Sequence, residues 1–142
     1  MPAAILQPVV VLVLWSMVMW AWLYATRIPA MRKANVPLDP NLTSADLAAA
    51  IPAPVRWKAD NYNHLMEQPT IFYATALAVQ VAGDATPLNL GLAWGYVGLR
   101  FVHTIIQCTS DNVMIRFYLF LASTLVLAIL AGSEIVTLLM AG

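Results

Sequence analysis

The 142-residue chain contains little charge and a single cysteine. Seven basic and seven acidic side chains leave a formal net charge of zero, so the composition gives no reason to expect a nucleic-acid partner. Because Cys108 is alone, an internal disulfide is impossible. The chain also lacks a phosphate-binding glycine loop, a serine nucleophile elbow and a paired-carboxylate hydrolase pattern. These absences set aside the corresponding classes of enzyme.

Apolar residues dominate what is present. They make up 61% of the chain, and the mean hydropathy is +0.76, whereas a soluble domain is roughly 45 to 50% apolar. The composition therefore predicts an integral membrane protein. The chain has room for one bundle, a single domain over residues 1–142.

The apolar stretches predict an all-α, multi-pass four-helix bundle. The expected spans are 5–28, 60–82, 88–108 and 113–140, joined after the first by a proline-rich loop over 29–59. The first stretch has no basic segment before it, so we expect a retained helix and not a signal peptide. Within the loop, Thr43 to Asp46 reads as a capping box, which predicts a short helix over 47–51.

Basic residues are distributed asymmetrically over the predicted loops. The first loop and its flanks hold five of the seven, whereas the second loop carries only Asp84. By the positive-inside rule, the first and third loops are expected in the cytoplasm, with both termini on the other side. We expect the inner membrane of a bacterium, because the chain is compact and carries no eukaryotic retention signal.

Polar side chains are expected to gather in the cytoplasmic half of the bundle. A charge at the centre of a spanning helix costs roughly 2.5 to 3.5 kcal/mol, so such residues usually face a partner, a cavity or a ligand. Helical spacing places Asn63 and Glu67 on one face, and Arg100, His103 and Gln107 on another. Arg116 starts the fourth span at the same depth. We expect the two faces to meet.

Such a set of side chains suits a small zwitterionic ligand with several carboxylates. Guanidinium groups bind carboxylates in a bidentate manner, Glu67 can take an ammonium group, and Asn63 and Gln107 can bind amides. A thiol on the ligand would be held as its reactive thiolate by a nearby arginine. The competing interpretation is structural, in which Glu67 pairs with Arg100 or His103 only to hold helices together.

Two other features offer weaker chemistry. His64 and His103 could bind a metal, but their spacing matches no known metal motif, and no metal site is predicted. Cys108 is more typical of a small buried apolar residue than of a reactive thiol. Pro69, shortly after Glu67, predicts a kink in the second span.

Three short motifs together resemble one family. The segment Asn61 to Phe72 contains an asparagine and a glutamate before a proline, Arg100 and His103 form Arg-x-x-His, and Arg116 follows thirteen residues later. In this order they resemble the MAPEG family, the membrane-associated proteins of eicosanoid and glutathione metabolism. The resemblance covers nearly the whole chain, including the long first loop.

The resemblance implies a homotrimer that binds glutathione between subunits near the cytoplasmic side. A lipophilic substrate would approach from the bilayer and its lipids. Arg116 would stabilise the glutathione thiolate as the catalytic residue. The binding residues would be Asn63, Glu67, Arg100, His103 and Gln107. The implied function is a membrane-bound glutathione-dependent transferase or peroxidase that acts on lipophilic electrophiles.

Departures from the family pattern keep an alternative open. Asp60, Asn61 and Tyr62 stand where enzymatic members carry arginines, and Gln107 stands where a tyrosine is expected. A non-catalytic lipid-binding or scaffolding protein of the same fold is therefore the second hypothesis. A small transporter, with Glu67 and His103 relaying protons, is the third, although no internal repeat is evident.

Overall fold

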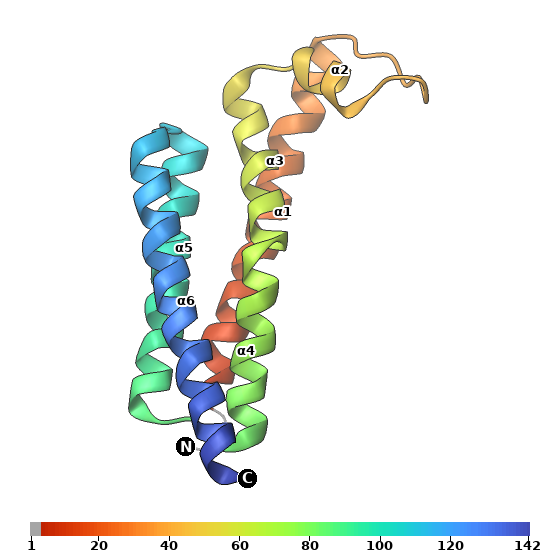
Figure 1. Cartoon of the computed structure of the whole chain (residues 1–142). Coiled ribbons are helices and arrows are strands. Elements are labelled where there is room, and N and C mark those ends of the chain that lie inside the picture. Colours follow the sequence, from red (N-terminus) through yellow and green to blue (C-terminus); the bar gives the residue numbers. More distant parts are fainter. Residues whose placement is uncertain (1–3) are drawn as a thin grey trace.

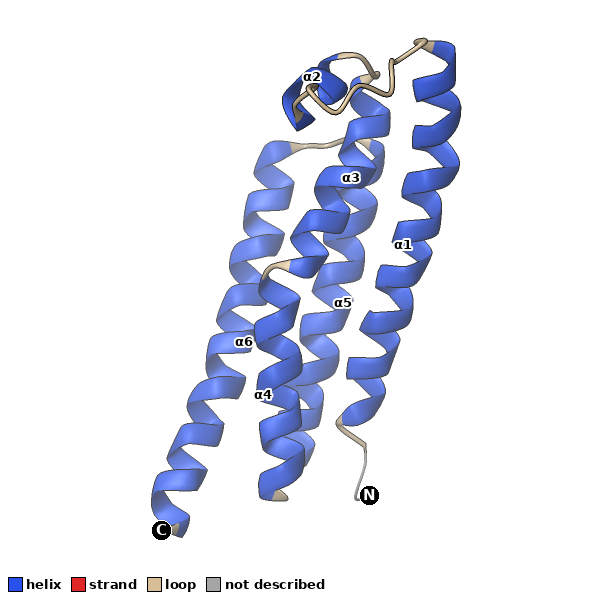
Figure 2. Ribbon diagram, turned by 90° about the vertical axis from the view of Figure 1, so that its right-hand side faces the viewer, coloured by secondary structure: helices blue, strands red, loops and turns tan. Residues whose placement is uncertain are grey.

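A computed structural model describes residues 4–142, and its regular structure is entirely helical over that range. The six helices are α1 (Leu6–Lys33), α2 (Ser44–Ala49), α3 (Ala53–Met66), α4 (Gln68–Ala82), α5 (Pro87–Thr109) and α6 (Val113–Ala141). The long helices run side by side, and α3 and α4 follow each other end to end in one rod (Figures 1 and 2). The all-α class predicted from the apolar stretches is therefore confirmed.

Two of the described helices, α1 and α6, are long and apolar enough to cross a membrane. Many of their large apolar side chains are exposed, including Leu14 on α1 and Ile129 on α6. α6 packs most extensively against α5, whereas α1 packs mainly against α3. α1 begins at the end of the molecule where α6 finishes (Figure 1). Membrane-like helices are thus present, and the four predicted spans remain a prediction.

The first helix is longer than expected. The sequence predicted its end at residue 28, before Pro29, but α1 continues to Lys33 with Pro29 inside it. A proline removes only one helical hydrogen bond, to the carbonyl four residues earlier. The helix ends at Lys33 because Asn35, two residues later, has a left-handed φ of 49°, and Val36 N–H donates to Met31 O at 3.2 Å. This is the geometry of a Schellman cap.

The rod of α3 and α4 corrects two further boundaries. α3 begins at Ala53, not near Asp60, because Pro52 and Pro54 open the helix. The first turn of a helix tolerates proline, since its amides have no helical acceptor there. The predicted single span over 60–82 is also interrupted at Glu67, where φ is −90° and ψ is −97°. The break is sharper than the predicted kink.

The loop after α1 contains the expected capping box, one turn earlier than the helix was placed. The Thr43 hydroxyl and backbone N–H both donate to Asp46 Oδ2, at 2.6 and 2.9 Å, and Asp46 N–H donates back to Thr43 Oγ1. α2 therefore covers Ser44–Ala49 and not 47–51. These hydrogen bonds hold the pKa of the Asp46 carboxyl below its ordinary value.

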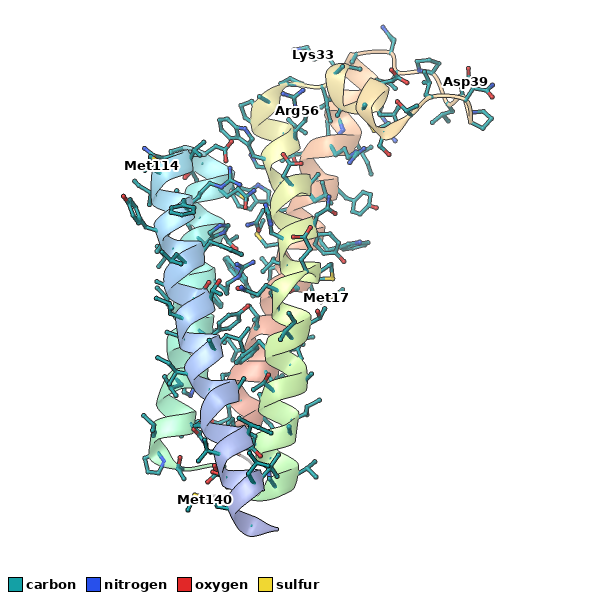
Figure 3. The ribbon with its side chains drawn as sticks, viewed as in Figure 1. Met17, Lys33, Asp39, Arg56, Met114 and Met140 are labelled. Atoms are coloured by element: carbon teal, nitrogen blue, oxygen red, sulfur yellow. The ribbon has the colours of Figure 1, made fainter. Side chains whose placement is uncertain are left out.

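Opposite ends of the molecule differ in chemistry. Lys33 and Arg56 lie at the end opposite Met140 (Figure 3). At the Met140 end, Asn89 Nδ2 and the Thr137 hydroxyl both donate to Asp84 Oδ2 at 3.0 Å. The Ser133 hydroxyl donates to Asn89 Oδ1 at 2.9 Å. This network ties the α4–α5 turn and the first turn of α5 to α6 at that end.

The turn after α4 yields the first stability prediction. Gly83 has a φ of +76°, and a Cβ added there would meet no atom within 4 Å, so the cost of a side chain is conformational. We expect Gly83→Ala to destabilise the protein by about 1 to 2 kcal/mol, measured as a lower thermal midpoint in detergent. Gly83→Asn should cost less, because asparagine tolerates this conformation. Equal midpoints for all three proteins would contradict the prediction.

The capping box yields a second prediction, about the local stability of α2. Asp46→Ala should speed hydrogen exchange of the α2 amides, whereas Asp39→Ala in the same loop should not. Since the folded-state pKa of Asp46 is lowered from 3.8, the cap is complete above that pH and is lost as the pH falls through the lower value. α2 protection that does not change with acidification would contradict this assignment.

Candidate functional site

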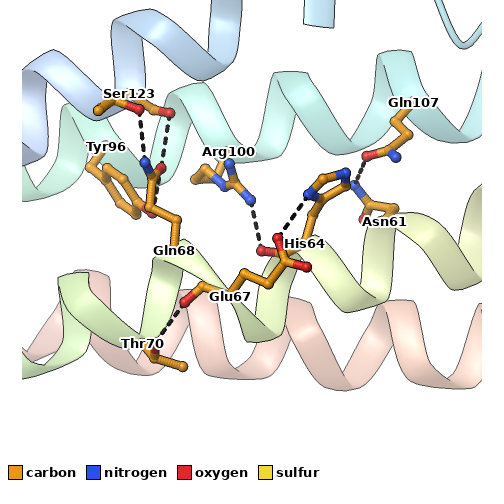
Figure 4. A network of polar contacts seen from close by, with 10 residues as sticks. Asn61, His64, Glu67, Gln68, Thr70, Tyr96, Arg100, Gln107 and Ser123 are labelled. Atoms are coloured by element: carbon orange, nitrogen blue, oxygen red, sulfur yellow. Dashed lines mark hydrogen bonds and ion pairs between the residues drawn. The ribbon is translucent and has the colours of Figure 1, made fainter. Parts of the chain in front are cut away.

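The break between α3 and α4 leaves the His64 carbonyl accessible to two donors. Glu67 N–H donates to His64 O at 3.3 Å, and Arg100 Nη2 donates to the same oxygen at 3.1 Å (Figure 4). Pro69 has no N–H for the Leu65 carbonyl, so the normal helical ladder cannot continue through this point. The interruption therefore gives the α5 arginine its anchor.

Arg100 is the most deeply buried charged residue among those described, with 1% of its surface exposed. Its Nε and Nη1 atoms have no hydrogen-bond partner within residues 4–142. A buried guanidinium with one carbonyl partner is costly unless an anion or further acceptors complete its shell. Arg100 is therefore suited to hold an anionic ligand group.

The predicted polar face of α5 is present and buried. Arg100, His103 and Gln107 are 1%, 4% and 1% exposed, as their spacing along one helix face required. Opposite them lies Asn61, not Asn63: Asn61 Nδ2 donates to Gln107 Oε1 at 2.9 Å. Two residues correspond to about 200° of rotation around a helix, so the two asparagines point in opposite directions.

Asn63 is instead exposed and lines a different cavity of about 230 Å³. This cavity lies between α1, α2 and α3, and Arg27, Arg56 and Asp60 also line it. The expectation that Asn63 and Glu67 face the α5 stripe together is thus wrong for Asn63. The roles of all the named residues in binding remain predictions.

Glu67 and His64 form a pair at the break. Glu67 Oε2 lies 3.3 Å from His64 Nδ1, and the two side chains are 68% and 37% exposed. The His64 and His103 rings are 6.1 Å apart and meet edge to face. Glu67 therefore pairs with His64, which the sequence suggested only as a weak metal ligand, and not with Arg100 or His103.

Arg116 lies at the start of α6 and forms an ion pair with Asp111. Asp111 precedes the helix with a left-handed φ of 48°, in the turn where Asn112 caps α6 by accepting from Ile115 N–H. The sequence pointed to no binding or catalytic role for Asp111. Its closeness to Arg116 in the sequence was an available signal, since the two positions are five apart.

A cleft of about 240 Å³ brings three basic side chains together. Its polar walls are His64, His103 and Arg116, and its apolar walls are Val113, Phe117 and Phe120. A basic wall beside an apolar one can bind a polar anion and an oily molecule next to each other.

Gln68 links the break to α5 and α6. Gln68 Nε2 donates to Thr124 Oγ1 at 2.7 Å, and the Tyr96 and Ser123 hydroxyls donate to Gln68 Oε1 at 3.2 and 3.4 Å (Figure 4). These three contacts hold the first turn of α4 in place. They were not predicted, because the sequence gives no signal of which helix faces Gln68.

Comparison with known protein families identifies the family of the chain. The model of the MAPEG family matches residues 5–136, nearly the full length. The chain belongs to the MAPEG family. The resemblance inferred from its three short motifs is confirmed. Comparisons with curated proteins and with solved structures returned no significant match.

Membership of the MAPEG family agrees with the two membrane-like helices. The family includes glutathione-dependent transferases and peroxidases, as well as other members. The motifs that indicated MAPEG membership converge in the structure around one region, from the α3–α4 break through α5 to the start of α6.

The two asparagines of α3 provide a test of the interior geometry. Asn61→Ala leaves the buried Gln107 amide without its partner, so we expect a loss of about 1 to 3 kcal/mol in stability, seen as a lower thermal midpoint. Asn63→Ala is the matched control and should change the midpoint little, because its side chain is exposed. The reverse order of the two midpoints would contradict the placement.

Proposed function

We propose that this MAPEG protein binds glutathione and uses its thiol as the nucleophile that conjugates or reduces lipophilic electrophiles within the membrane. The observation that carries the proposal is the incomplete shell of the buried Arg100, which contacts the carbonyl of His64, a residue in the wall of the cleft that Arg116 also lines. Glutathione offers two carboxylates, an ammonium group, amides and a thiol. The residues present fit these groups, since Arg100 and the exposed carboxylate of Glu67 lie at the break and Arg116 lines the adjoining cleft.

Each residue would bind a different group of the ligand. Arg100 would bind a ligand carboxylate through its free Nε and Nη1 donors. Glu67 would receive the ammonium group, and Gln107 would bind an amide while Asn61 orients it. Asn63 retains a binding role only for a part of the ligand that reaches the outer side of α3. His103, in the cleft wall, would contact the portion next to the thiol.

Arg116 would stabilise the thiolate. A guanidinium beside a thiol favours its anionic form and so lowers the thiol pKa. The ion pair with Asp111 fixes the direction of Arg116 before the ligand arrives, which is the arrangement that electrostatic catalysis requires. The reaction itself would be conjugation to an electrophilic carbon or reduction of a peroxide.

The lipophilic substrate would occupy the apolar side of the cleft. Phe117 and Phe120 are 54% and 41% exposed on α6, so they face the bilayer or a neighbouring subunit. A homotrimer, as is common in the family, would close the cleft with a second subunit. The α3–α4 rod and α5 would complete four spans of a multi-pass bacterial inner-membrane protein. Its basic end, with the first and third loops, would face the cytoplasm.

A second function is supported by the surface of α3. Asp60 and Asn63 line the outer cavity, and no lysine or arginine lies between Lys58 and Arg100 in the sequence. If the second span needs its own arginine to hold glutathione, the protein would be a non-catalytic lipid-binding or scaffolding trimer. The two functions share a fold and differ in the ligand.

Calorimetric titration of glutathione into detergent-purified protein distinguishes them. We expect saturable binding in the micromolar to millimolar range, about 4 to 8 kcal/mol. Arg116→Ala should weaken it by about 10- to 100-fold, the usual effect of removing a charged hydrogen bond. Arg32→Ala, a basic residue outside the cleft, should bind like the wild type.

The contrary result is equally informative. A folded wild-type protein that retains lipid but binds no glutathione would contradict the enzyme proposal and favour the lipid-binding function. Bound lipid is measured by native mass spectrometry of the same preparation.

A further inference from the structure

His64 lies in the wall of the cleft that also contains Arg116. Its Nδ1 atom faces the Glu67 carboxylate at 3.3 Å (Figure 4). A carboxylate beside one ring nitrogen favours the proton on that nitrogen, which leaves the other, Nε2, with a free lone pair. The pair therefore has the arrangement of a general base oriented by an acidic residue.

Three hydrogen bonds to backbone carbonyls hold this pair in place. Arg100 Nη2 and Glu67 N–H both donate to the His64 carbonyl, and the Thr70 hydroxyl donates to Glu67 O at 2.6 Å. His64 is the last residue but two of α3, and Glu67 is the break itself. A continuous helix would keep the Glu67 backbone in helical geometry, so the interruption sets where its carboxylate lies relative to His64.

The other charged groups around His64 define its chemistry. Arg100 contacts its carbonyl, Arg116 shares its cleft, and the His103 ring lies 6.1 Å away on α5. The two guanidiniums favour a thiolate on the ligand, and the Glu67 carboxylate faces the ring nitrogen of His64 that does not accept the thiol proton. His103 is the competing base, but it is 4% exposed and its Nδ1 has no partner within the described residues.

We propose that His64, oriented by Glu67, is the general base that removes the thiol proton of glutathione at this site. The inference rests on the proposed function. The S–H bond breaks, the proton passes to His64 Nε2, and the electron pair stays on sulfur beside Arg116. Sulfur then bonds to an electrophilic carbon of the lipophilic substrate. In an addition, His64 returns the proton to the substrate atom that receives the displaced electron pair. In the displacement of a chloride, the chloride leaves with the electron pair and His64 releases the proton to water.

The test compares His64→Gln with the wild type, using glutathione and a nitroaryl chloride as probes. Calorimetry measures binding, ultraviolet absorbance measures bound thiolate against pH, and product absorbance measures turnover. His64→Gln should bind glutathione within about threefold, form thiolate only at higher pH, and lose about 10²- to 10⁴-fold in rate near neutral pH. The defect should shrink above about pH 8.5, where free thiols ionise unaided.

Three further variants complete the design. Met66→Leu, an exposed neighbour outside the cleft, should match the wild type. His64→Asn should reproduce His64→Gln, which excludes a folding defect peculiar to one substitution. Glu67→Gln should shift the thiolate curve in the same direction by a smaller amount, with weaker glutathione binding.

Each outcome decides between the two proposals. If the wild type binds no glutathione, the proposed function fails and the base fails with it. If the wild type binds glutathione and forms thiolate, an unchanged pH curve in His64→Gln overturns the base and leaves the function standing. A shift in His103→Gln with none in His64→Gln would assign the proton to His103 and overturn the proposal.

Discussion

The structure depends on how an apolar bundle accommodates Arg100. A guanidinium that is 1% exposed must find acceptors inside the protein, and the His64 carbonyl supplies one. That carbonyl is reachable because α3 ends at Met66 and α4 starts at Gln68. The break therefore supplies the acceptor that a buried cation needs. The donors of Arg100 that remain without a partner among the described residues, Nε and Nη1, define the ligand chemistry.

The same break organises the polar groups on either side of it. On the α3 side it presents His64 and Glu67 as a pair at the edge of the cleft. On the other side of the break, α4 begins with Gln68, whose contacts with α5 and α6 fix the direction of α4. Arg116 reaches the cleft from a third element, held by Asp111. One irregular residue thus joins contributions from α3, α4, α5 and α6, which explains why short motifs far apart in the sequence belong together.

Much of the fold followed from local patterns. The apolar stretches located all the long helices, the capping box located α2 within a turn, and Asn112 caps α6 as a residue of its type commonly does. Boundaries at prolines were the main error. Pro29 was expected to end the first helix and Pro52 to lie in a loop, yet the first lies inside a helix and the second starts one. Proline's effect depends on its position in the helical ladder, which composition alone does not reveal.

For the site, the sequence by itself determined which residue types are available, the buried stripe of α5 and the family. A helix that buries one face imposes a fixed period, so the spacing of Arg100, His103 and Gln107 was enough to group them. The tertiary structure alone decided that Asn61 and not Asn63 faces Gln107, and that Glu67 pairs with His64. Those facts depend on the rotation of α3 and on a break in its backbone, and both are set by packing between helices that are distant in the chain.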